Sequence, residues 1–116
     1  MFIKESNLTI NVKDLDKSVS FYESIGLELK IRWGNYYAQL VAPGVIIGLH
    51  PTSDNNLTGN SGNVSIGFIV DNFEEVRSLL QELSIKITEI QEEGGQFIHF
   101  YDPDGTALYF ILPKWQ

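Results

Sequence analysis

The sequence predicts an α+β fold built from two copies of one β-α-β-β-β module. A shift of 58 positions superimposes the alternating apolar residues of 8–12 on those of 66–70, which indicates an internal repeat. A stripe of apolar residues at helical spacing follows each of these stretches. Three further extended segments, separated by turn residues, follow each predicted helix.

The first module is predicted to cover residues 1–50. Its opening strand is followed by a helix that Asp14 can cap and that Gly26 can end. Gly34 and Asn35 form a turn pair typical of a two-residue hairpin loop. The apolar stripe of the helix consists of Leu15, Val19, Tyr22 and Ile25, and the later strands are expected at 27–33, 36–41 and 45–50.

The second module is predicted to cover residues 64–116 with the same order of elements. Asn72, with Glu75 three residues later, resembles a capping box at the start of its helix. The helix stripe consists of Phe73, Val76, Leu80 and Leu83, and the later strands are expected at 85–90, 97–101 and 107–112. Turns are expected at 92–96 and at Asp102-Pro103-Asp104-Gly105.

Residues 51–63 are rich in Asn, Ser, Thr and Gly, which predicts a linker between the modules. The chain of 116 residues is expected to form a single domain, residues 1–116. A four-stranded sheet with a helix on one face must still cover its other face. Pairing of the two sheets would therefore enclose a cleft, where we expect a ligand.

Composition restricts the compartment and the partners. The chain has no cysteine, no apolar run long enough to span a bilayer and no secretory leader pattern, which together favour the cytoplasm over secretion or membrane insertion. The net charge of −7 makes nucleic acid an unfavourable partner, because such binding depends on Lys and Arg that neutralise phosphates. An acidic surface favours a cationic small molecule or serves solubility alone.

Two segments carry a resemblance to a known family. They are Val12-x-Asp14-Leu15-Asp16-x-Ser18-x-x-Phe21-Tyr22-x-x-Ile25-Gly26-Leu27 and Phe100-Tyr101-Asp102-Pro103-Asp104-Gly105-Thr106. Both resemble signatures of the vicinal oxygen chelate superfamily, the glyoxalase/bleomycin resistance protein/dioxygenase family. The resemblance covers essentially the whole chain and implies curved mixed sheets around a cleft. It also implies small-molecule binding or metal-dependent lyase, dioxygenase or transferase chemistry.

The resemblance further implies four metal-ligand positions, two in each module. In this chain they hold Asn7, Gly48, Ser65 and Tyr109, where the family usually has His, Gln or Glu. A catalytic divalent metal typically needs three strong donors such as imidazole or carboxylate. We therefore expect no bound metal and no cofactor.

Strand alternation predicts which side chains line the cleft. The ligand-binding candidates are Asn7, Thr9, Trp33, Tyr37, His50, Ser65, Phe97, His99, Tyr101 and Tyr109. His50 and His99 are either an acid-base or metal pair or two separately hydrogen-bonded histidines, and the lack of a third donor favours the second interpretation. The hairpin aromatics Trp33 and Tyr37 either stack on a planar ligand or pack across the strands.

Two hypotheses from different classes follow. The first is a metal-free binding protein that sequesters an aromatic or cationic compound, such as an antibiotic. The second is a lyase or transferase with an altered site, in which His50, His99 and Tyr109 are the candidate catalytic residues. A homodimer is expected in either case, because each sheet would otherwise leave an edge or a face exposed.

Overall fold

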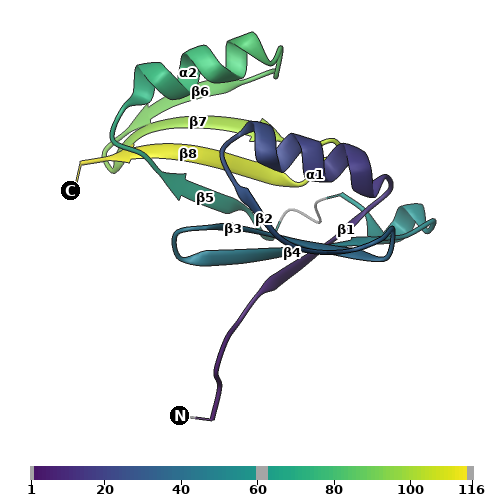
Figure 1. Cartoon of the computed structure of the whole chain (residues 1–116). Coiled ribbons are helices and arrows are strands. Elements are labelled where there is room, and N and C mark those ends of the chain that lie inside the picture. Colours follow the sequence, from purple (N-terminus) through teal and green to yellow (C-terminus); the bar gives the residue numbers. More distant parts are fainter. Residues whose placement is uncertain (1, 60–62, 115–116) are drawn as a thin grey trace. The chain divides into compact units, whose positions relative to one another are not determined.

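The chain forms two compact units in the computed structural model, which describes residues 2–59 and 63–114. Unit 1 extends to Gly59, and unit 2 contains the described residues from Asn63 onward. Each unit has the predicted order β-α-β-β-β (Figure 1). Within the described ranges, neither helix is long and apolar enough to cross a membrane.

Unit 1 consists of four strands, one α-helix and a short 3-10 helix, all in the residues described. They are β1 Leu8–Val12, α1 Leu15–Ser24, β2 Glu28–Trp33, β3 Tyr37–Ala42, β4 Val45–Pro51 and the 3-10 helix Asn55–Leu57. The sheet order is β1-β4-β3-β2, with β1 parallel to β4 and the other pairs antiparallel.

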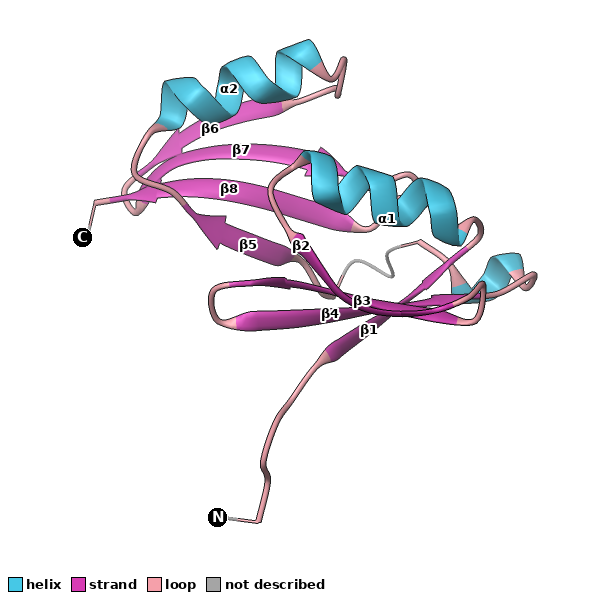
Figure 2. Cartoon of the chain, in the orientation of Figure 1, coloured by secondary structure: helices cyan, strands magenta, loops and turns pink. Residues whose placement is uncertain are grey.

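Unit 2 repeats this arrangement without the 3-10 helix. Its elements are β5 Ile66–Ile69, α2 Phe73–Glu82, β6 Thr88–Glu92, β7 Gly95–Tyr101 and β8 Ala107–Pro113. The sheet order is β5-β8-β7-β6, with β5 parallel to β8 (Figure 2).

The helices begin where the sequence predicts. The Asp14 carboxylate accepts a hydrogen bond from the backbone N–H of Lys17, and the Asn72 side chain accepts one from that of Glu75. Each therefore satisfies a donor that the first helical turn leaves unpaired. After α1 the chain turns at Gly26, whose φ of 113° favours glycine.

α1 buries its apolar stripe against one face of its own sheet, whereas the predicted stripe of α2 is buried only in part, since Val76 is half-buried and Leu83 is 38% exposed. In unit 1, Tyr22 and Leu15 of α1 lie buried with Leu40, Ile47 and Leu49 of the sheet. In unit 2, the buried side chains include Phe73, Leu80, Ile98, Phe100, Leu108 and Phe110. The rings of Phe100 and Phe110 stack at 5.4 Å between centroids. The other face of each sheet, which its helix does not cover, is called the helix-free face.

Some predicted boundaries were wrong, each for a local reason. The strand predicted at 85–90 begins only at Thr88, because Ser84 adopts a positive φ and the Ile85 N–H still donates to the Leu80 carbonyl of α2. The hairpin loop predicted as Gly34-Asn35 has three residues, 34–36, since Trp33 pairs with Tyr37.

The turn predicted at 92–96 is shorter, because Glu92 pairs directly with Gly95. An added Cβ on Gly95 would lie 2.3 Å from the Leu112 carbonyl oxygen, so only glycine allows this approach to β8. The predicted linker 51–63 is partly ordered: Pro51 belongs to β4, and Asn55–Leu57 is helical. Residues 60–62 of this linker lie outside the described residues.

The turn before β8 depends on a buried carboxylate. Asp102 is 5% exposed, and its Oδ1 accepts hydrogen bonds from the backbone N–H groups of Asp104 and Thr106, at 2.9 and 2.8 Å. We expect Asp102→Ala to lower the free energy of unfolding by about 1.5–3 kcal/mol, the range for hydrogen bonds to a charged group. Asp102→Asn keeps an acceptor oxygen and should lose less. Urea unfolding measures both, and equal losses would contradict the hydrogen-bond account.

An ion pair joins α2 to β6. Arg77 Nε and Nη2 contact the Glu89 carboxylate at 2.6–3.1 Å, and these hydrogen bonds lower the pKa of Glu89. A lowered folded-state pKa contributes stability above the ordinary carboxylate pKa, which is lost as the pH falls through the folded value.

Glu89→Gln should therefore be less stable than the natural protein at neutral pH, and the difference should shrink below about pH 4. Denaturant unfolding at both pH values tests this. The matched control is Glu92→Gln. Glu92 lies on the same strand, and it forms no ion pair with any of the described residues. If the difference in unfolding free energy between Glu89→Gln and the natural protein stays constant with pH, the ion pair does not stabilise the fold as described.

Candidate functional site

The helix-free face of unit 1 carries most of its predicted ligand-binding residues. Strand pairing places Thr9 beside Gly48, Asn11 beside His50 and Gln39 beside Gly48. Trp33 pairs with Tyr37 across the hairpin. The residues of this face include Thr9, Asn11, Trp33, Tyr37, Gln39, Gly48 and His50, together with the apolar Val41 and Ile46, which follow the same alternation along β3 and β4. Asn7 is exposed and lies one residue before β1, not within the strand as predicted.

Tyr37 fills the centre of this face. A Cβ built on Gly48 would lie only 2.5 Å from the Tyr37 hydroxyl and 3.1 Å from Thr9 Oγ1. The Tyr37 hydroxyl accepts a hydrogen bond from Gln39 Nε2 at 3.0 Å. The phenol therefore occupies the space that a side chain at position 48 would need.

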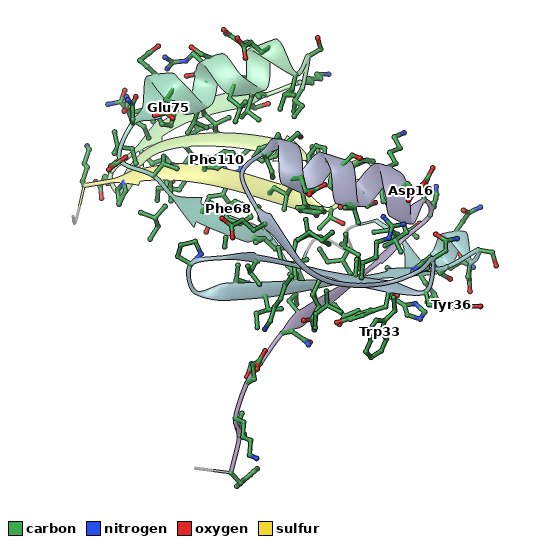
Figure 3. All side chains as sticks on the ribbon, viewed as in Figure 1. Asp16, Trp33, Tyr36, Phe68, Glu75 and Phe110 are labelled. Carbon is green, nitrogen blue, oxygen red and sulfur yellow. The ribbon has the colours of Figure 1, made fainter. Side chains whose placement is uncertain are left out.

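Trp33 extends the aromatic surface of unit 1. Its ring lies 6.0 Å from that of Tyr37, and 66% of the residue is exposed. Figure 3 shows Trp33 on the side of the sheet away from α1, whereas Asp16 lies on α1. The sequence offered two interpretations of this pair, stacking on a planar ligand or packing across the strands. Trp33 fits both, because it packs against Tyr37 across the hairpin and still offers part of its ring to solvent.

The helix-free face of unit 2 is richer in aromatic rings. Strand pairing joins Thr88 to His99, His99 to Tyr109, and Tyr109 to Gly67. Phe97 lies on the same face, two residues before His99, and pairs with Ile90. Ser65 is exposed and lies one residue before β5, so it also falls outside the strand in which it was predicted.

Three of these side chains form a ring cluster, namely Phe97, His99 and Tyr109. The ring centroids are 5.9 Å apart for Phe97 and His99, 5.7 Å for His99 and Tyr109, and 6.0 Å for Phe97 and Tyr109. Phe97 and His99 are nearly parallel, at 14°. The Tyr109 ring lies over Gly67, where an added Cβ would approach it to 2.2 Å.

A cavity of about 480 Å³ opens beside this ring cluster. It is lined by Lys86, Thr88, Ile90, His99, Phe100 and Tyr101. Its volume falls within the range of about 300–1,000 Å³ that is typical of small-molecule sites. His99 belongs both to the cluster and to the cavity wall, so a ligand in the cavity would contact the ring of His99, with those of Phe97 and Tyr109 next to it.

The four metal-ligand positions implied by the resemblance do not suit a divalent metal. Gly48 offers no donor, and the Tyr37 phenol fills the adjacent space. Tyr109 presents a phenol packed over Gly67, and the remaining positions offer an amide and a hydroxyl. Within residues 2–59 and 63–114, no three His, Cys, Asp or Glu side chains gather in a way that could hold a metal ion.

Residues 6–110 match the Glyoxalase/Bleomycin resistance protein/Dioxygenase superfamily. The chain belongs to this superfamily. Among characterised relatives, it is 30% identical over 112 residues to the glutathione transferase FosA of Serratia marcescens, covering 89% of this chain and 76% of that protein. It is 28% identical over 112 residues to the metallothiol transferase FosB of Lysinibacillus sphaericus, covering 90% and 79%.

Solved structures confirm the predicted superfamily fold. The fosfomycin resistance protein FosX of Listeria monocytogenes has a TM-score of 0.79 at 22% identity, covering 98% of this chain and 96% of that one. A bleomycin-binding protein complexed with bleomycin has a TM-score of 0.71 at 19% identity, covering 97% and 100%. These likenesses establish the fold of this superfamily member.

Sequence reasoning missed four side chains of the helix-free faces, namely Gln39, Lys86, Thr88 and Ile90. The strand predicted at 85–90 contained Lys86, whereas β6 begins only at Thr88, and no ligand role was predicted for the residues of that strand. The signal was present, since Lys86, Thr88 and Ile90 alternate with Ile85 and Ile87 in the sequence.

The packing of Tyr37 over Gly48 predicts an epistatic pair. We expect Gly48→Ala to destabilise unit 1 by about 1–3 kcal/mol, the usual cost of overpacking, because its Cβ meets the Tyr37 hydroxyl. Adding Tyr37→Ala should recover part of this loss, since the clash disappears. Thermal unfolding of the two single variants and the double variant measures the coupling. Additive losses would contradict the predicted clash.

Proposed function

We propose that this superfamily member binds a small planar aromatic molecule on the helix-free face of unit 2. The observation that carries the proposal is the ring cluster of Phe97, His99 and Tyr109 beside a cavity of suitable volume. Aromatic pairs contribute about 0.5–1.5 kcal/mol each beyond area burial. Rings whose centroids are held 5.7–6.0 Å apart by strand pairing lose little conformational freedom when a ligand stacks on them.

Ligand binding in this proposal does not use a metal ion. The donors at Asn7, Gly48, Ser65 and Tyr109 are too weak as a set to hold one, because they include neither imidazole nor carboxylate. The affinity should therefore be the same before and after treatment with a chelator. Elemental analysis that finds a stoichiometric transition metal in the purified protein would contradict this part of the proposal.

The alternative is an enzyme of the lyase or transferase type. The names of the transferase relatives favour it, as does the contact of the His99 and Tyr109 rings. The third candidate of that hypothesis, His50, belongs to unit 1 and is exposed. Thiol transfer to fosfomycin, assayed with added divalent metal and either glutathione or a small thiol, distinguishes this alternative from binding alone.

The chemical class of the natural ligand is a separate question from the position of the binding site. One related structure is a fosfomycin resistance protein and another is a bleomycin-binding protein, so these two antibiotics are the first compounds to test. The net charge of −7 left two interpretations open, namely attraction of a cationic ligand or solubility alone. The charged side chain that lines the cavity is, however, Lys86, so local charge opposes a cationic ligand.

Homodimer formation is also proposed. β1, β2, β5 and β6 are the outer strands of the two sheets within the residues described, and outer strands offer unpaired backbone groups. Gel filtration with light scattering that gives a monomer at micromolar concentration would contradict it. Cytoplasmic location stays a prediction.

The ring cluster can be tested with 2-naphthamide, a neutral planar probe. We expect saturable binding that Phe97→Leu and Tyr109→Leu each weaken roughly two- to tenfold, the equivalent of about 0.5–1.5 kcal/mol per lost ring contact. Fluorescence titration measures the affinity, and thermal unfolding confirms that each variant is folded.

Tyr36→Leu is the matched control for this test. Tyr36 lies on the unit 1 hairpin and is 80% exposed, so its replacement removes an aromatic ring without changing the cluster. The proposal fails if the natural protein does not bind the probe, or if folded Phe97→Leu and Tyr109→Leu bind it as tightly as the control does.

A further inference from the structure

The cavity of unit 2 has a positive charge at one end. Lys86 precedes β6 by two residues and lines the cavity together with Thr88, His99 and Tyr101. The pairing of β6 with β7 begins at Thr88 and His99, so Lys86 lies outside the paired strand. Its place in the cavity wall beside Thr88, Ile90 and Tyr101 nevertheless puts it on the same side of the sheet as these residues.

The acidic side chains of β6 do not neutralise this lysine. Glu89 lies on the opposite face and is paired with Arg77 of α2. Glu92 is six residues beyond Lys86, about 20 Å along an extended chain. Within residues 2–59 and 63–114, no carboxylate lies at ion-pair distance from Lys86. The ammonium group is therefore available to a ligand.

The other polar side chains of the cavity can also donate hydrogen bonds. Thr88 has a hydroxyl, Tyr101 a phenol and His99 a ring N–H in every protonation state. No hydrogen bond to another side chain or to the backbone occupies these three side chains in the part of the chain that the structure describes. Donors beside an ammonium group suit an acceptor that carries negative charge.

We propose that Lys86 makes this cavity selective for an aromatic carboxylate. The inference rests on the proposed function, since the ring cluster binds the planar body of the ligand while Lys86, assisted by Thr88 and Tyr101, binds its carboxylate. A single lysine matches the single charge of a carboxylate better than the double charge of a phosphate monoester. Lys86 is thus a specificity-determining residue.

The test uses three probes with one planar body: 2-naphthoate, 2-naphthamide and 2-naphthylmethylammonium. The natural protein should bind 2-naphthoate most tightly and the ammonium compound most weakly. Lys86→Met, which keeps the length of the side chain, should weaken 2-naphthoate binding roughly two- to fivefold, as expected for the loss of one solvent-exposed ion pair. It should leave the affinity for 2-naphthamide unchanged.

Two further variants exclude indirect effects. Lys86→Arg retains the charge and should retain the preference for 2-naphthoate. Lys17→Met removes one positive charge from an exposed side chain of α1 in unit 1, so it reports the effect of net charge alone and should not change the preference. Added salt should weaken 2-naphthoate binding more than 2-naphthamide binding.

The outcomes separate this inference from the function on which it rests. If the natural protein binds none of the three probes, both fail. If it binds 2-naphthamide through the ring cluster but shows no preference for 2-naphthoate, only the inference fails. The inference is equally overturned if Lys86→Met weakens the binding of both probes alike, or if Lys17→Met reduces the preference as much as Lys86→Met does.

Discussion

Each helix covers only one face of a four-stranded sheet, and the chemistry of each unit depends on this constraint. Strand alternation sends Ile98, Phe100, Leu108 and Phe110 into the core of unit 2. The residues between them, among them Phe97, His99 and Tyr109, then have to point away from the helix. The packing that stabilises the unit therefore also determines which side chains a ligand can reach.

Both units place a tyrosine ring over a glycine on the neighbouring strand. In unit 1, Tyr37 of β3 lies over Gly48 of β4, and in unit 2, Tyr109 of β8 lies over Gly67 of β5. A Cβ at either glycine would collide with the ring, so a larger residue there would require the tyrosine to move. The two packings are not equivalent under the repeat, because β4 supplies the glycine in unit 1 whereas the corresponding strand β8 supplies the tyrosine in unit 2. The superfamily resemblance implies metal ligands at positions 48 and 109. In this chain position 48 is a glycine without a side chain, and position 109 carries a phenol.

The fold was largely predictable, because its signals are local. The helix caps Asp14 and Asn72 and the alternation of apolar residues were enough to give the order of elements. The errors arose where a specific contact in the folded unit, and not the pattern of residue types, decides the outcome. The start of β6 depends on the bond from Ile85 to Leu80, and the short turn before β7 depends on the contact of Gly95 with Leu112. The ring cluster was predicted as separate candidates. The alternation of Lys86 with its neighbours was visible in the sequence, but only the structure shows that Lys86 lines a cavity beside His99.

Whole-chain charge was a poor guide to the ligand for a related reason. Fifteen acidic and eight basic side chains give the net charge of −7, yet charges in physiological salt are screened over about 8 Å. Glu89, the acidic residue of β6 nearest the cavity, is paired with Arg77 on the other face. Only charges within a screening length of the cavity act strongly on a ligand there, and Lys86 lines its wall. The charge at the wall of this cavity is therefore that of Lys86, whatever the sign of the net charge of the chain.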